Sequence, residues 1–267
     1  MGGGIFGFTM GLSFTFLGSG TSYGVPMIGC GCPVCRSADR RDRRLRAAGC
    51  LRDGTTTLLF DIGPDLREQA LRANLDRIDA VFLTHTHADH LHGIDDLRGF
   101  TRLSREMLPV YAQKDDVDFV RQHFNYIFED GDFRLGWGIP RLDLRVVDGA
   151  AVQVGGVSVQ PVPLCHGRGA AMGYRIGRLA YLTDCSLIPE TSYPLLQDLE
   201  VLIIDGLRWH AHPTHFSFEQ AFAEARKIGA GRTYLTHLTH DIAYAATERQ
   251  LPDHIHLAYD GLVVDCS

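Results

Sequence analysis

The sequence has no excess of basic residues. It contains 26 Lys and Arg against 32 Asp and Glu, for a net charge of −6. A surface that binds long RNA or DNA needs a field of positive charge, so the composition argues against a long nucleic acid as partner. A small phosphorylated substrate stays open, because a few local arginines can bind a phosphate without making the whole protein basic.

The N-terminal stretch lacks both a basic n-region and a long apolar run, so it matches neither a secretory signal nor a membrane span. We expect residues 1–11 to be a flexible leader, followed by one domain over residues 12–267, with no membrane partner. The seven cysteines are an odd number without a secretion signal, which argues against a disulfide scaffold and for a reducing cytoplasm. No internal repeat is visible.

Apolar segments of strand length alternate with helical patterns and predict an α/β fold in which helices cover two sheets. The predicted strands are residues 12–17, 55–60, 80–83, 108–112, 151–154, 157–162, 172–176, 179–183, 201–205 and 232–236. The predicted helices are residues 64–73, 95–104, 115–126 and 218–228. We expect residues 129–150 to be irregular, and the arginine-rich residues 36–46 to form a solvated loop or short helix face.

A cluster of metal-type ligands directly follows the apolar run at residues 80–83. His85, His87, Asp89 and His90 lie within six residues. Side chains two apart on an extended strand end point the same way, so His85 and His87 can converge on one ion. Asp89 and His90, in the turn beyond, can then face a second ion. The alternative is an exposed polar loop without a metal, but four potential ligands at this spacing favour a metal site.

Further ligand-type residues end predicted strands. His166, Asp184 and His237 each come at such a junction. Because a strand end is where an α/β sheet presents its chemistry, these side chains fit one common site. Asp61 ends another strand, and we expect it either to orient a metal-bound imidazole or to cap the helix that follows.

A second possible metal site is the C-x-C-x-x-C run of Cys30, Cys32 and Cys35. Such a run supplies three tetrahedral ligands and leaves the fourth to come from elsewhere. A redox pair at Cys32 and Cys35 is the alternative interpretation, but it leaves Cys30 unexplained and no thioredoxin-like strand and helix surround it. The sequence therefore favours a metal knuckle.

Taken together, these residues resemble the metallo-β-lactamase superfamily, whose signature H-x-H-x-D-H is matched by the cluster that follows residue 84. The resemblance extends to the downstream ligands and covers nearly the whole chain from residue 12. It implies a four-layer αββα sandwich with a binuclear metal site at the sheet edges. The implied ligands are His85, His87 and His166 for one ion and Asp89, His90 and His237 for the other, with Asp184 bridging.

The cysteine knuckle narrows the resemblance to the PhnP-like cyclic-phosphate phosphodiesterases. In that family three cysteines and a late histidine hold a structural zinc, which implies Cys30, Cys32, Cys35 and His240 here. The resemblance also implies a homodimer, and a catalytic histidine in the loop before a late helix. His215 fits that context best, with His212 as the competitor.

The function that this resemblance implies is metal-dependent hydrolysis of a small, cyclic phosphodiester by a hydroxide held between two Mn²⁺ or Zn²⁺ ions. Asp89, Asp184 and His215 would be the catalytic residues. We consider Arg168, Tyr174 and Arg208 as phosphate clamps, although each can equally be a surface group.

Three other functions stay open. The first is an RNase Z-like nuclease, and the second is a non-catalytic metal-binding accessory protein of cofactor biosynthesis. Thioester hydrolysis is the third, but it does not account for the cysteine knuckle.

Overall fold

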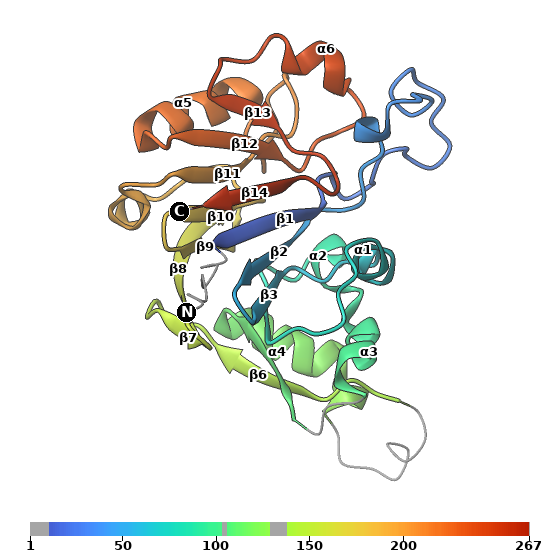
Figure 1. Cartoon of the computed structure of the whole chain (residues 1–267), viewed down its shortest axis with the longest axis vertical. Helices are drawn as coiled ribbons and strands as arrows, with labels where there is room; N and C mark the ends of the chain where they lie inside the picture. The colour runs from blue at the N-terminus through green and yellow to red at the C-terminus, as the bar shows by residue number, and fades with distance from the viewer. Residues whose placement is uncertain (1–10, 103–105, 129–137, 267) are drawn as a thin grey trace, which may run out of the picture.

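The computed structural model describes residues 11–102, 106–128 and 138–266. Residues 1–10 of the predicted leader lie outside these ranges. The described strands form two sheets of seven strands each, which stack face to face with helices on both outer faces (Figure 1). This is the αββα arrangement that the resemblance implied, so the predicted fold class is confirmed.

The first sheet has the strand order β14-β1-β2-β3-β4-β5-β6. Its strands are β1 (Leu12–Gly18), β2 (Ala48–Asp53), β3 (Thr56–Phe60), β4 (Ala80–Phe82), β5 (Leu108–Ala112), β6 (Leu142–Val146) and β14 (Val263–Cys266). Strands β3 to β6 pair in parallel, as in the register of Phe60 with Phe82. Their carboxyl ends therefore lie at one edge.

The second sheet has the order β13-β12-β11-β10-β9-β8-β7. Its strands are β7 (Val152–Val154), β8 (Val157–His166), β9 (Gly169–Ile176), β10 (Leu179–Leu182), β11 (Val201–Asp205), β12 (Arg232–Thr236) and β13 (Ile255–Leu257). Strands β10 to β13 are parallel, whereas β7, β8 and β9 form an antiparallel meander.

Helices cover the outer face of each sheet. The first sheet packs against α1 (Leu66–Arg72), α2 (Ala88–Leu91) and α4 (Lys114–His123), with α3 (Arg98–Thr101) beside them, and the second against α5 (Phe218–Ile228) and α6 (Tyr244–Glu248). The 3₁₀ helices include η1 (Arg40–Asp42), η2 (Ile94–Leu97), η3 (Asn125–Ile127) and η5 (Glu190–Leu196). No helix among the described residues is long and apolar enough to cross a membrane.

An aromatic core fills the space between the sheets. Phe14, Phe60 and Phe82 of the first sheet meet Tyr174 and Tyr181 of the second, and all five are at most 1% exposed. The Phe60 and Tyr174 ring centroids are 5.7 Å apart. Each such buried ring contributes about 2–3 kcal/mol, which fixes the two sheets against each other. The site edges of both sheets are thereby held in register.

Helix α5 illustrates how local sequence fixes an element next to the site. Ser217 caps its N-terminus in a capping box with Gln220, and Gly229 ends it in the left-handed conformation at φ 74°. Phe218 and Ala221 bury its apolar face against the second sheet. The helix therefore anchors the loop that precedes it, which carries His215.

Several elements differ from the sequence predictions. The predicted helix 95–104 is split into η2 and α3, and residues 103–105 lie outside the description. Residues 129–150, expected to be irregular, contain β6, while residues 129–137 are not described. Strands β2, β13 and β14 were not predicted. They are short segments without strong apolar alternation, and pairing with a neighbour stabilises them.

Arg44 departs from the solvated loop expected for residues 36–46. Its side chain is fully buried and pairs with Asp42 at 3.2 Å. It also donates hydrogen bonds to the carbonyl oxygens of Thr239 and Ile242, at 3.1 and 2.8 Å. Arg44 thus ties the N-terminal loop to the segment after β12.

We expect Arg44→Met to lower the free energy of unfolding by about 3–5 kcal/mol, because Asp42 would keep a buried charge and two buried carbonyl oxygens would lose their donor. Urea denaturation at equilibrium measures this. Arg43→Met is the matched control, since Arg43 is exposed and its loss should cost less than about 0.5 kcal/mol. A similar small change in both variants would contradict the prediction.

Candidate metal centre

The site lies where strands of both sheets end. His166 and Asp205 are the last residues of β8 and β11, while Asp184 and His237 follow β10 and β12 within two residues. Asp61, directly after β3, has φ 63°, and Asp184 and His237 have φ 54° and 63°. The left-handed region is costly for residues other than glycine, by roughly 1–3 kcal/mol each. This strained backbone at three strand ends marks a functional edge.

The first group of ligand-type side chains contains His85, His87 and His166. One imidazole nitrogen from each lies within 4.8 Å of the others. The ring centroids of His85 and His87 are 4.4 Å apart, and each is 5.1 Å from that of His166. His87 is exposed while the other two are buried, so this group opens to solvent.

The second group contains Asp89, His90 and His237, which are all buried. One ligand atom from each lies within 4.8 Å of the others. Gly63 lets the chain approach here, because a Cβ at this position would lie 1.9 Å from the Asp89 carbonyl oxygen. Asp184 lies between the two groups. Its Oδ2 is 3.1 Å from His90 Nε2, and its Oδ1 is 3.4 Å from His237 Nε2.

Hydrogen bonds orient the imidazoles so that one nitrogen stays available. His90 Nδ1 donates to Asp61 Oδ2 at 2.7 Å, and His166 Nδ1 donates to the Thr214 carbonyl oxygen at 2.8 Å. Asp61 therefore orients an imidazole, as one of its two predicted roles required, while helix α1 has Asp65 at its N-cap. Such bonds fix the tautomer of metal-ligating histidines.

The donor set fits divalent cations. Among the described residues, the buried nitrogens His85 Nε2, His90 Nε2 and both ring nitrogens of His237 form no well-aligned hydrogen bond, although Asp184 oxygens lie 3.1 Å from His90 Nε2 and 3.4 Å from His237 Nε2. An unpaired buried nitrogen is costly unless a cation accepts its lone pair. Imidazole nitrogens and carboxylate oxygens are donors that Zn²⁺ and Mn²⁺ use. Here they form two groups of three side chains, with the Asp184 carboxylate between the groups. Whether these seven residues ligate metal stays a prediction.

The charges of the site also favour the binding of cations. Burial raises the pKa of Asp184, but the imidazoles of His237 and His90 outweigh it and hold that pKa well below its usual value. Burial lowers the pKa of His237, yet the Asp184 and Asp89 carboxylates raise it to about 9. The buried carboxylates thus attract positive charge, and protons and divalent cations compete for the same imidazoles.

His215 lies beside both groups on a different support. Its Nδ1 donates to Asp205 Oδ2 at 2.7 Å and lies 3.9 Å from Asp184 Oδ1. Asp205 is fully buried and its Oδ2 also accepts the Cys185 N–H, so the carboxylate is fixed. This leaves His215 Nε2 as the nitrogen available to a substrate. Asp205 was not predicted as a site residue, although its place at the end of a buried apolar strand was a usable signal.

A cavity of about 420 Å³ opens onto the site and is lined by His85, His87, His166 and His215, among others. His212, the competitor of His215, does not line it. Its Nδ1 instead accepts a hydrogen bond from Thr214 Oγ1 at 3.1 Å.

The three predicted phosphate clamps do not line this cavity either. Tyr174 is fully buried and donates its hydroxyl to the Leu83 carbonyl oxygen, so its predicted role is wrong. Arg168 is exposed and Arg208 half-buried, and both lie outside the cavity wall.

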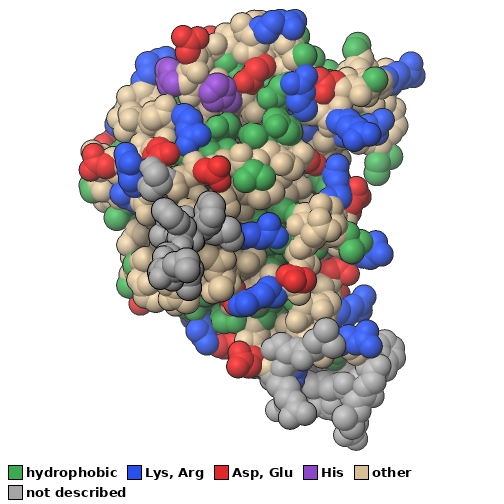
Figure 2. Space-filling view, in the orientation of Figure 1, with side chains coloured by type: hydrophobic (Ala, Val, Ile, Leu, Met, Phe, Trp, Pro, Cys, Tyr) green, Lys and Arg blue, Asp and Glu red, His purple; other side chains and the backbone are tan. Residues whose placement is uncertain are grey.

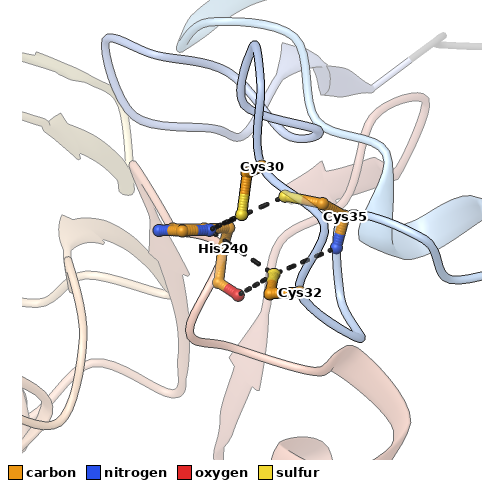
Figure 3. Close-up of side chains that lie close together, drawn as sticks. All are labelled: Cys30, Cys32, Cys35 and His240. Carbon is orange, nitrogen blue, oxygen red and sulfur yellow. Dashed lines mark hydrogen bonds between the residues drawn. The ribbon is translucent and has the colours of Figure 1, made fainter.

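The cysteine knuckle is assembled from the two ends of the chain (Figure 3). Cys30, Cys32 and Cys35 place their sulfurs 3.3, 3.5 and 3.6 Å from His240 Nδ1. A hydrogen bond from the Cys35 N–H lowers the pKa of Cys32 to about 6, while burial raises the pKa of Cys35 to about 11. No disulfide joins the seven cysteines, all of which are described. Four such ligands at these distances are compatible with a tetrahedral zinc site.

We expect Cys32→Ser to remove about one equivalent of zinc per chain and to lower the melting temperature by about 5–10 °C, because a lost thiolate loosens a four-ligand site. Metal analysis and calorimetry of the purified protein measure this. Cys165→Ser, which changes a half-buried thiol outside the cluster, should alter neither quantity. Full zinc content and unchanged melting in Cys32→Ser would contradict the prediction.

Comparison with known proteins agrees with this architecture. The family model of the beta-lactamase superfamily domain matches residues 56–238. The chain belongs to the metallo-β-lactamase superfamily of metal-dependent hydrolases. Within it, the chain is similar to a crystal structure described as a new diphosphatase from the PhnP family. That structure has a TM-score of 0.89 and 40% identity, with 96% of this chain and 98% of that chain covered.

Two curated relatives show the range of names in this superfamily. An octanoyltransferase of Porphyromonas gingivalis (strain ATCC BAA-308 / W83) is 41% identical over 250 residues, which are 92% of this chain and 50% of that protein. The chain therefore spans about half the length of this relative. A ribonuclease Z of Bacillus mycoides (strain KBAB4) is 26% identical over 285 residues, covering 85% of this chain and 89% of that protein.

Proposed function

We propose that this chain is a metal-dependent phosphodiesterase that hydrolyses a small, cyclic or linear, phosphodiester. The attacked phosphorus would carry two bridging oxygens, a definition that includes the P–O–P bond of a disubstituted diphosphate. The observation that carries the proposal is the His215–Asp205 pair at 2.7 Å, beside two groups of metal-type ligands around one open cavity. The diphosphatase relative supports cleavage at phosphorus.

Seven side chains would hold two divalent cations, Mn²⁺ or Zn²⁺. The first cation would bind His85, His87 and His166, the second Asp89, His90 and His237, and Asp184 would bridge them. Bound cations of this kind supply Lewis acidity and lower the pKa of water toward neutrality. The pKa of the buried Asp184 carboxyl is held well below its usual value by the imidazoles of His237 and His90, so this side chain can face such charge as an anion.

His215 would act on the leaving group. Asp205 accepts the Nδ1–H of His215, which fixes the ring and directs Nε2 toward the substrate. The protonated Nε2 would then donate a proton to the leaving alkoxide oxygen, or a hydrogen bond to a phosphoryl oxygen whose charge grows during attack. Since the ring is only 11% exposed, bulk water competes weakly for that proton.

A nuclease function is the main competitor, because the ribonuclease Z relative matches over most of both chains. The net charge of −6 opposes it. On the face drawn in Figure 2, basic and acidic side chains are interspersed rather than sorted into one basic track. A long RNA needs phosphate contacts along its backbone. A small diester needs only the cavity.

The test is the hydrolysis of four small probes and of a precursor tRNA after reconstitution with Mn²⁺ or Zn²⁺. We expect bis(p-nitrophenyl) phosphate to exceed p-nitrophenyl phosphate by about 100-fold in kcat/KM, since a monoester dianion repels the nucleophile more strongly. A dinucleoside diphosphate tests the P–O–P bond, and an octanoyl thioester tests the chemistry of the longer relative.

Three outcomes would overturn the proposal. Preference for the thioester would indicate acyl chemistry, and faster cleavage of a precursor tRNA than of the small diester would indicate a nuclease. A protein with two active-site cations per chain and no turnover of any probe would indicate a non-catalytic accessory role.

A further inference from the structure

The cavity at the candidate metal centre has an unusual charge pattern for a phosphate site. Among the described residues that line it, none is Lys or Arg. The lining carboxylates are Asp89, Asp116 and Asp184, and Asp116 alone lies outside the predicted ligand sets. A cavity that binds an anion would therefore carry one further negative group in its wall. The role of the Asp116 carboxylate in this wall therefore has to be explained.

Asp116 is held in place by neutral donors. It lies in the first turn of α4 and is half-buried. Thr86 Oγ1 donates to its Oδ1 at 3.1 Å, and Gln113 Nε2 donates to its Oδ2 at 3.3 Å. A carboxylate oxygen can accept two hydrogen bonds, so each oxygen of Asp116 retains one acceptor site. Among the described residues, no Lys or Arg forms an ion pair with Asp116.

These facts decide which part of a substrate can lie next to Asp116. A second phosphate there would meet a like charge without a compensating Lys or Arg, whereas a hydroxyl would form a charge-assisted hydrogen bond. The phosphorus itself would lie among the histidines. We propose that Asp116 is a specificity-determining residue that selects phosphodiesters whose ester group carries hydroxyl donors, as a sugar or nucleoside does. The proposal rests on the phosphodiesterase function above.

A purely structural role for Asp116 makes a different prediction. Thr86 lies between His85 and His87, so the Thr86–Asp116 bond could serve only to hold those two histidines. In that case Asp116→Asn would lower the content of active-site metal and would weaken all substrates alike. Selection of hydroxyl donors instead changes the ratio between substrates. The ratio is therefore the decisive measurement.

The experiment compares two matched substrates, the p-nitrophenyl ester of uridine 5′-monophosphate and its 2′,3′-dideoxy analogue. Both release the same leaving group and differ only in two hydroxyls. We expect the wild-type protein to prefer the ribose ester. In Asp116→Asn, which keeps an oxygen for Thr86, the ratio of kcat/KM should fall about tenfold, since a charged acceptor is replaced by a neutral one.

Asp115→Asn is the control, because it removes the same charge one residue away on an exposed position outside the cavity. Its ratio should match the wild type. An unchanged ratio in Asp116→Asn, an equal loss on both esters with less bound metal, or no wild-type preference for ribose would each overturn the proposal. If the wild type hydrolyses neither ester, nor bis(p-nitrophenyl) phosphate, nor the dinucleoside diphosphate, the phosphodiesterase function itself fails.

Discussion

Asp184→Ala should abolish turnover, with kcat at least about 10³-fold below the wild type, and should leave fewer than two active-site cations per chain. Asp184 faces His90 and His237 at 3.1 and 3.4 Å and lies between the two ligand groups. Removal of the bridging carboxylate would leave both cations with an incomplete donor set. Metal analysis and hydrolysis of bis(p-nitrophenyl) phosphate on the same sample measure both effects.

Two further variants make this result interpretable. Asp198→Ala is a matched control, because Asp198 is also an aspartate in the left-handed conformation, at φ 57°, but is exposed and remote from the site. It should retain activity and metal. Asp184→Asn keeps the shape of the side chain and should still lose the second cation. Full binuclear occupancy with retained turnover in either Asp184 variant would remove the bridging role.

His215→Ala should lower kcat by about 10²–10⁴-fold while the metal content stays that of the wild type, because general acid catalysis contributes by about that factor. The ring lines the cavity and lies close enough to His166 and Asp184 to form a further group of metal-type ligands. Its Nδ1 is committed to Asp205, however, and His215 is in neither ligand set proposed for the two cations. Single-turnover rates on a phosphodiester with an alkoxide leaving group, with metal analysis alongside, measure the change, because p-nitrophenolate leaves without protonation.

Two variants separate the chemistry of His215 from its position. His212→Ala should change kcat less than about twofold, since His212 does not line the cavity. Asp205→Asn should lower kcat without loss of metal, because an amide accepts the Nδ1–H less strongly and holds the ring less firmly. An unchanged kcat in His215→Ala would transfer the catalytic role to His212, and loss of a cation would make His215 a ligand instead.

The residues proposed for substrate choice and for catalysis come from different layers of the fold. His215 and Asp205 come from the loop and strand of the second sheet, on the side that α5 covers. Asp116 comes from α4, on the outer face of the first sheet. Because an aromatic core locks the two sheets together, groups from both layers keep fixed positions around one cavity.

The sequence by itself determined the residues whose chemistry depends on local spacing. The run from His85 to His90 carries its ligands within one strand end and one turn, so chain geometry alone brings them together. The runs Cys30 to Cys35 and His237 to His240 are local in the same sense. Strand ends also indicated the second half of the site, since parallel strands bring their carboxyl ends to one edge.

The tertiary structure alone decided which distant groups meet. Asp116 and Thr86 are 30 residues apart and come together because β4 and β5 pair in parallel below α4. The burial of Tyr174 and Arg44, both expected near solvent or substrate, likewise follows from sheet stacking and from contacts with residues far along the chain. The type of a residue and the hydrophobic periodicity around it indicate which roles a position can have. Only the packing of separate segments decides what it faces, because burial and pairing depend on neighbours that local sequence does not contain.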